Sequence, residues 1–171
     1  MVNIVNGQPV TFKEFLFQTQ QVQNSFQNYT FSNNRAITKS MLTWWAFQDN
    51  GQQLLPLESI LEIEHIYARN RYEKEHSLTN PRNVEALGNK VLLEKRINIR
   101  ASDYRFADKK KYYVGFENSR KQKKEGTRIK ELTDLAMNAA DFTESDIVQR
   151  NTKMIFDFVE FMNNNGLLSE D

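Results

Sequence analysis

Residues 61–67 read Leu-Glu-Ile-Glu-His-Ile-Tyr, so apolar and polar side chains largely alternate along this stretch. A period of two indicates a half-buried β-strand. One face of this strand would carry Leu61, Ile63, His65 and Tyr67. A second apolar run, at residues 91–93, follows Gly88 and predicts the partner strand of a hairpin. Residues 95–113 then predict a helix, so that strand, strand and helix follow one another along the chain.

Further helices are predicted on both sides of this unit. They cover residues 11–28, 34–48, 128–140 and 144–165. The first and the last of them begin with the spacing of a capping box, at Thr11 with Glu14 and at Thr143 with Asp146.

These elements predict an α+β fold, mostly helical, in which a short antiparallel hairpin plus helix packs among flanking α-helices. The polar residues 68–83 and the basic residues 114–126 are expected to be loops. A length of 171 residues fits one domain, so we expect residues 1–171 to fold as a single unit. Its parts would be a helical lead-in (1–50), a core (58–113) and C-terminal helices (127–165).

The composition excludes several classes of protein. Hydrophobic residues make up 39% of the chain, which is enough for a buried core, and there is no cysteine. Disulfides, thiolate zinc sites and cysteine nucleophiles are therefore excluded. No apolar run approaches the roughly 18 residues that a membrane span needs, and the first residues lack the pattern of a signal peptide. We therefore expect a cytoplasmic protein that does not interact with a membrane.

Positive charge is concentrated in one part of the chain. The net charge of the whole chain is only +1, but residues 95–130 hold thirteen Lys or Arg against four Asp or Glu. A segment of this density suits the phosphate backbone of a nucleic acid, and it equally suits a solvated surface loop.

The two histidines each follow a glutamate, in the pairs Glu64-His65 and Glu75-His76. A catalytic base needs a side chain held by its surroundings. The second pair lies in a polar stretch, whereas the first lies at the end of the alternating strand, so the first pair is the candidate. Neighbouring residues of a regular strand point to opposite faces, so the strand must end or bulge there if both side chains serve one site.

Two asparagines extend this pattern in the residues that follow. Gly88-Asn89 precedes the second predicted strand, and Asn98 lies nine residues later, in the first turn of the predicted helix. The order Glu64-His65-Ile66, Gly88-Asn89, Asn98 resembles the ββα-metal motif of HNH (His-Me finger) nucleases. More narrowly, it resembles the domain at the C-terminus of GmrSD-like, modification-dependent restriction endonucleases. The family pattern continues with Phe-x-x-Lys, here Phe106 to Lys109, and this chain has Lys90 where an apolar residue is usual.

The resemblance implies a metal-dependent DNA endonuclease, with the hairpin plus helix as a ββα-metal finger. Glu64 and Asn98 would be the metal ligands, since carboxylate and amide oxygens suit Mg²⁺ or Mn²⁺. His65 would be the general base, and Asn89 would orient its ring. The products would be 5′-phosphate and 3′-hydroxyl ends.

Further expectations concern the partners of the domain. Lys109, Arg105 and Arg100 are candidates for contacts with DNA phosphates, with surface solubility as the competing interpretation. In the family the nuclease domain often ends a longer protein, so the 171 residues could be its C-terminal region. An N-terminal or separate nucleotide-dependent domain would then supply specificity, and a homodimer would allow a double-strand cut.

Two other functions stay open at this point. One is a nuclease-like fold that binds nucleic acid or a partner without cutting. The other is cleavage of RNA or of structured DNA by the same residues. Retention of the complete set Glu64, His65 and Asn98 favours a cutting enzyme over the first of these.

Overall fold

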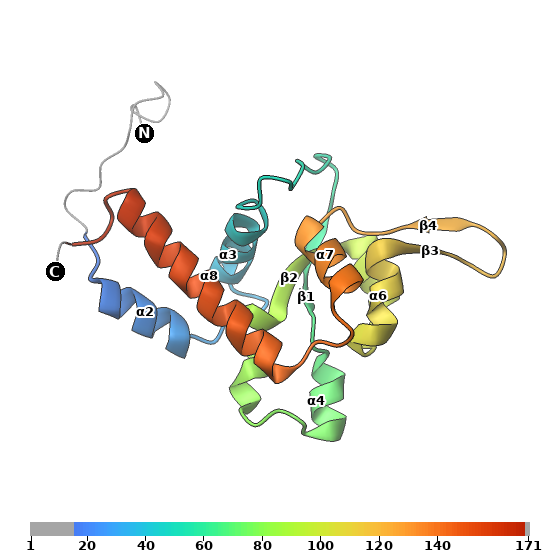
Figure 1. Cartoon of the computed structure of the whole chain (residues 1–171), viewed down its shortest axis with the longest axis horizontal. Coiled ribbons are helices and arrows are strands. Elements are labelled where there is room, and N and C mark those ends of the chain that lie inside the picture. Colours follow the sequence, from blue (N-terminus) through green and yellow to red (C-terminus); the bar gives the residue numbers. More distant parts are fainter. Residues whose placement is uncertain (1–15, 170–171) are drawn as a thin grey trace. The chain divides into compact units, whose positions relative to one another are not determined.

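The computed structural model describes residues 16–169, which divide into two compact units (Figure 1). The larger unit spans residues 30–151, and the smaller unit joins residues up to 29 with those from 152 onward. The predicted capping box at Thr11 and Glu14 lies outside the described residues. Each unit has its own buried residues, and each is described separately below.

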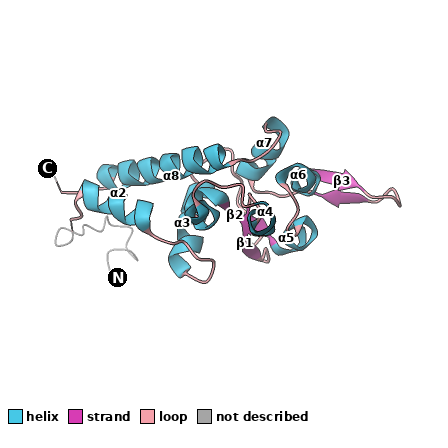
Figure 2. Ribbon diagram, turned by 90° about the horizontal axis from the view of Figure 1, so that it is seen from below, coloured by secondary structure: helices cyan, strands magenta, loops and turns pink. Residues whose placement is uncertain are grey.

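The larger unit is an α+β fold with more helix than strand (Figure 2). Its helices and strands are α3 (Ala36–Ala46), β1 (Leu61–His65), α4 (Arg69–Glu75), the 3₁₀ helices η1 (Pro81–Glu85) and η2 (Leu87–Asn89), β2 (Lys90–Glu94), α5 (Lys95–Ala101), α6 (Phe106–Val114), β3 (Gly115–Glu117), β4 (Lys123–Glu125), α7 (Lys130–Asn138) and the first part of α8 (Glu144–Asn164). The expected helix-rich α+β class is confirmed.

The hairpin predicted from the alternating stretch is formed by β1 and β2. The two strands are antiparallel and pair without interruption from Leu61 opposite Glu94 to His65 opposite Lys90. Val91, Leu92 and Leu93 are almost completely buried. Helix α3 contacts β2, and α5 contacts both strands, so the hairpin lies between these two helices (Figure 2).

The segment 95–113 forms two helices, where the sequence predicts one. Helix α5 ends at Ala101, and Ser102 has a φ of 47°, outside the helical region. Helix α6 begins at Phe106, which is buried. The buried side chains of Phe106, Lys109 and Tyr113 mark the inner face of α6.

Two of the predicted loops contain regular structure. Residues 68–83 include helix α4, which has no buried residue to give a hydrophobic signal. Ion pairs of Arg71 with Glu75 and with Asp141 support it instead. Residues 114–126 form the hairpin β3–β4, which extends away from the helices of this unit (Figure 1). At Gly126 an added Cβ would meet the backbone of Val114, so the close approach of the two chains requires glycine there.

Gly88 lies where the chain passes very close to α8. A Cβ atom at this position would lie 2.6 Å from the backbone nitrogen of Asn151 and would also strike the carbonyl oxygen of Ile147. The Gly88 N–H donates to the side-chain oxygen of Asn151 at 3.0 Å. The glycine that precedes Asn89 is therefore required for packing of the turn against a helix.

We expect Gly88→Ala to lower the free energy of unfolding by about 1–3 kcal/mol, because overpacking against a fixed backbone forces the helix to move. Urea unfolding measures this loss. Gly51→Ala is the matched control, since a Cβ there first meets the flexible end of the Lys130 side chain. Equal effects of the two substitutions would contradict this account of Gly88.

The smaller unit consists of α2 (Thr19–Asn28) and the second part of α8. Val22, Val159 and Met162 are buried between them, and Phe26 packs on Phe158 with ring centroids 5.0 Å apart. Of the helix predicted for residues 11–28, the described part runs from Thr19 to Asn28, because Gln18 is extended and Phe17 pairs with Leu168. Residues 11–15 lie outside the described residues. Across the part of the chain that the structure describes, no helix is both long and apolar enough to cross a membrane.

Candidate active site

Glu64 is a buried carboxylate on β1, with 6% of the residue exposed. Its Oε1 atom accepts hydrogen bonds from Nζ of Lys109 at 2.6 Å and from the hydroxyl of Tyr113 at 2.9 Å. Lys109 and Tyr113 lie four residues apart on α6, so one face of that helix supplies both donors. Lys109 also donates to the carbonyl oxygen of His65 at 2.8 Å.

The protonation of this group depends on its burial. Removal from water raises the pKa of Glu64 above its ordinary value, although the charge and hydrogen bond of Lys109 and the bond from Tyr113 act in the opposite direction. Burial likewise raises the pKa of Tyr113 well above its ordinary value, so the phenol keeps its proton and stays a donor. The second oxygen of Glu64, Oε2, has no hydrogen-bond partner among residues 16–169.

Asn98 lies on α5 and contacts the same face of β1. Its Nδ2 donates to Oε2 of Glu62 at 2.9 Å, and Lys95 approaches Oε1 of Glu62 at 3.6 Å. Glu62 and Glu64 are two residues apart on β1, so their side chains leave the same face of the strand. Within the described chain the Oδ1 atom of Asn98 has no hydrogen-bond partner. Glu62 is a site residue that sequence reasoning missed, although its spacing from Glu64 was the available signal.

His65 is the last residue of β1, and its side chain is 13% exposed. Its Nε2 atom is buried, lacks a hydrogen-bond partner in the described residues, and lies 3.5 Å from Oε1 of Glu85. Burial, and after it the charge of Lys90, lower the pKa of His65 to about 4, while Glu85 opposes the shift. The imidazole is therefore neutral at physiological pH and can accept a proton.

Lys90 is fully buried at the position where the family resemblance has an apolar residue. Its ammonium donates to Glu85 at 2.6 Å, to the side chain of Asn33 at 2.8 Å and to the carbonyl oxygen of Phe31. The three acceptors match the three N–H donors of the ammonium. The bond to Glu85 also holds that carboxylate next to His65. Sequence reasoning missed Glu85, which carries no motif signal of its own.

The side chains of Glu64 and His65 leave opposite faces of the hairpin. Their partners on β2, Val91 and Lys90, are consecutive in an unbroken register, so the strand has no bulge. Glu64 contacts α6, whereas His65 lies beside Glu85 of η1. The strand ends at His65, and in the structure the two side chains contact different elements.

Asn89 holds the turn after β1 through the main chain. Its side-chain oxygen accepts from the N–H of Tyr67 at 2.7 Å, and its Nδ2 donates to the carbonyl oxygens of Tyr67 and Val84 at 3.1 and 2.9 Å. None of these three bonds reaches the ring of His65, to which the sequence interpretation assigned Asn89. The residue therefore fixes the chain that follows His65, and acts on the ring only through that backbone.

Arg150 of α8 fixes the same turn from the other side. Its Nη1 atom donates to the carbonyl oxygens of Leu87, Gly88 and Lys90, the shortest of these bonds being 2.7 Å. The rest of the guanidinium binds Glu131 of α7 in a bidentate pair, at 2.6 and 2.8 Å. Burial alone would raise the pKa of Glu131, but Arg150 and the indole of Trp45 hold the pKa below its ordinary value of 4.5.

We therefore expect Glu131 to stabilise the fold in a pH-dependent way. A carboxyl whose pKa is lowered by folding contributes stability above its unfolded pKa, and this contribution is lost as the pH falls through the folded pKa. Glu131→Gln should cost about 1.5–3 kcal/mol at neutral pH, the range for hydrogen bonds to charged groups. The difference from wild type in urea unfolding should shrink below a pH of about 4.5. A difference that stays constant down to acidic pH would contradict the assignment.

The residues predicted to contact DNA lie in three different environments. Lys109 is only 1% exposed and is bound to Glu64, so its ammonium does not face solvent. Arg105 is exposed and forms an ion pair with Glu75. Arg100 donates to the main-chain oxygens of Arg96 at 3.3 Å and Glu125 at 3.1 Å. Residues 16–169 contain no cluster of three or more His, Cys, Asp or Glu that could bind a metal by themselves.

The fold and these residues define a helix-rich α+β domain with a carboxylate and a histidine at the end of one strand, β1, and an amide on the helix α5. The chain belongs to the family described as GmrSD restriction endonucleases, C-terminal domain, whose sequence model matches residues 17–156. This match confirms the resemblance drawn from the motifs. Neither the curated proteins nor the solved structures that were compared include a match to the chain.

Proposed function

We propose that this domain is a metal-dependent endonuclease that hydrolyses phosphodiester bonds of DNA in restriction or anti-phage defence. In this proposal β1, β2 and α5 act as a ββα-metal finger. Membership of a restriction-endonuclease family supports the reaction class. The observation that carries the proposal is the buried carboxylate of Glu64, which is held by hydrogen bonds at one oxygen. The next residue in the sequence is His65, whose imidazole is neutral.

The chemistry of the donor set fits a hard divalent cation such as Mg²⁺ or Mn²⁺. Glu64 offers Oε2, and Asn98 offers Oδ1, two oxygen atoms that the described residues leave without hydrogen bonds. Oxygen donors of these kinds are preferred by both cations. Lys109 and Tyr113 hold the other oxygen of Glu64, and so they limit the carboxylate to one free ligand atom. When bound, the cation would neutralise charge on the phosphate and on the leaving oxygen.

His65 is the group that would remove a proton from the attacking water. A low pKa keeps the ring in the unprotonated form, and Glu85 lies close enough to stabilise the proton once it is taken up. Asn89 and Arg150 fix the turn that faces His65 across the hairpin, and so they limit the movement of the strand end. The expected products are 5′-phosphate and 3′-hydroxyl ends.

We infer the substrate and the additional domain from the membership of this family. DNA is the proposed substrate, and a separate or N-terminal domain would select the modification or sequence to be cut. That domain would also carry any dependence on nucleotides.

The proposal is tested at Asn98. We expect Asn98→Ala to weaken Mn²⁺ binding by at least about 10–100-fold, the loss seen for residues that merely support a metal ligand. Isothermal titration with Mn²⁺ measures this, and cleavage of a labelled duplex should fall in parallel and recover in part at high Mn²⁺. Asn163→Ala, at an exposed position of α8, is the control. Unchanged Mn²⁺ affinity in Asn98→Ala would exclude this ligand set.

A further inference from the structure

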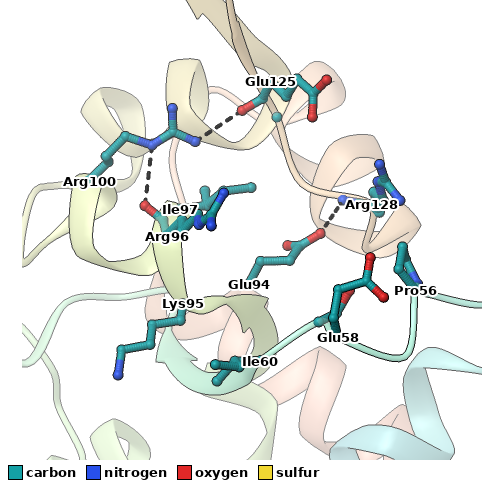
Figure 3. A pocket seen from close by; sticks show the side chains of 12 residues that line it. Pro56, Glu58, Ile60, Glu94, Lys95, Arg96, Ile97, Arg100, Glu125 and Arg128 are labelled. Atoms are coloured by element: carbon teal, nitrogen blue, oxygen red, sulfur yellow. Dashed lines mark hydrogen bonds between the residues drawn. The ribbon is translucent and has the colours of Figure 1, made fainter.

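A pocket of about 390 Å³ lies beside the candidate site, between α5, the end of β4 and the residues that precede β1 and α7 (Figure 3). Its charged lining comprises four basic and three acidic residues. These are Lys95, Arg96, Arg100 and Arg128, and Glu58, Glu94 and Glu125. Arg96 and Arg128 lie on opposite sides of the pocket in this view.

Arg96 and Arg128 differ from the arginines that hold the fold together. Arg71, Arg105 and Arg150 each form an ion pair with a carboxylate. Arg96 and Arg128 are exposed and form no ion pair within residues 16–169. Both guanidinium groups therefore keep their donors for a ligand, and a guanidinium is well suited to bind phosphate oxygens.

Arg100 adds a positive charge that forms no ion pair within residues 16–169. Its two hydrogen bonds end on the carbonyl oxygens of Arg96 and Glu125, which carry no net charge. The bond to Glu125 connects α5 to β4, so it fixes two walls of the pocket relative to each other, whereas the bond to Arg96 lies within α5 (Figure 3).

Glu94, one of the acidic residues that line the pocket, already accepts hydrogen bonds from the protein. Both oxygens of Glu94 accept hydrogen bonds, one from the Thr127 hydroxyl at 2.5 Å and one from the Arg128 N–H at 2.7 Å. The four basic and three acidic side chains that line the pocket leave it with a formal charge of +1. The hydrogen bonds to Glu94 also place Arg128 at the wall, because they fix the main chain of that residue.

The pocket adjoins the candidate metal site through Lys95. This residue lines the pocket, and its ammonium lies 3.6 Å from Glu62, the partner of Asn98. On the other side, β4 carries Lys123 and Lys124 away from the pocket, along the β3–β4 hairpin. Positive charge therefore extends from the candidate metal site, through the pocket, to the hairpin.

We propose that this pocket binds the phosphate backbone of the DNA strand next to the bond that is cut, with Arg96 and Arg128 as the phosphate ligands. The inference rests on the proposed nuclease function, and assigns its substrate a binding surface away from the reacting atoms. Each phosphate contact releases counterions, so it should add about 0.9 to the slope of log affinity against log salt concentration.

The test is fluorescence anisotropy of a labelled duplex with the full chain in EDTA, over a series of NaCl concentrations. We expect Arg96→Gln/Arg128→Gln to weaken binding on the order of tenfold at low salt and to reduce the salt slope by about 2. Arg96→Lys/Arg128→Lys should keep the slope, because the charges remain. The matched control is Arg35→Gln/Arg82→Gln, which removes two exposed arginines that also lack ion pairs within the described chain.

The outcomes separate this inference from the proposed function. Wild-type affinity and slope in Arg96→Gln/Arg128→Gln, or an equal loss in the control, would overturn the pocket while metal-dependent cutting still stands. A wild-type chain that neither binds nor cuts DNA would overturn both. Circular dichroism and thermal unfolding of each variant show that the fold is intact, which is expected because all four arginines are exposed.

Discussion

His65→Ala is expected to slow cleavage of duplex DNA by about 10²–10⁴-fold, the contribution of a positioned general base. The ring is neutral, lies at the end of β1 and has a buried Nε2 that the described residues leave without a hydrogen bond. Binding of the duplex should stay close to wild type, because the proposed phosphate contacts of Arg96 and Arg128 lie elsewhere. Single-turnover cleavage and fluorescence anisotropy measure the two quantities separately.

His76→Ala is the matched control for this experiment. Both histidines follow a glutamate, but His76 is exposed and ends helix α4 with a φ of 46°. We expect the His76 variant to cut at nearly the wild-type rate. If His65→Ala and wild type cut equally well, the catalytic assignment is wrong. If neither cuts but both bind DNA, a binding module that does not cleave becomes the better account.

Lys109→Met is expected to lower the free energy of unfolding by about 3–5 kcal/mol, the cost of leaving one member of a buried ion pair without its partner. Lys109 and Glu64 are 1% and 8% exposed at their side chains, and Nζ lies 2.6 Å from Oε1. Thermal and urea unfolding measure the loss. Lys111→Met, at an exposed position of the same helix, should change stability by less than about 0.5 kcal/mol.

The double variant Lys109→Met/Glu64→Gln tests the physical reason. Glutamine carries no charge to leave unpaired, so a large part of the lost stability should return. Simple addition of the two single effects would show that Lys109 stabilises by packing alone and does not act through Glu64.

The hairpin could be predicted from the sequence because its signal is local. Alternation at residues 61–67 and the apolar run at 91–93 specify two strands, and the intervening 3₁₀ turns do not disturb them. Helix α4 could not be predicted in this way. It buries no residue, and it depends on an ion pair between Arg71 and Asp141, which are far apart in the sequence.

The candidate site was predictable in its residues more than in their roles. The spacing of Glu64, His65 and Asn98 identified the strand and the helix that carry them. Lys109 was predicted to contact DNA phosphates, with surface solubility as the competing interpretation, and both leave its ammonium exposed because lysine is rarely buried. In the structure its ammonium instead pairs with the buried carboxylate of Glu64 on β1 at 2.6 Å. Its contact with Glu64 depends on the break between α5 and α6, which the sequence interpretation did not include.

The central claim is that Glu64, His65 and Asn98 form one metal-dependent site for cutting DNA. The most direct measurement is nicking of supercoiled plasmid by the full chain in Mg²⁺, Mn²⁺ or EDTA, with wild type beside His65→Ala. We predict nicking in either metal, none in EDTA, and its loss in the variant. Nicking that persists in EDTA, or that is equal in wild type and variant, would contradict the claim.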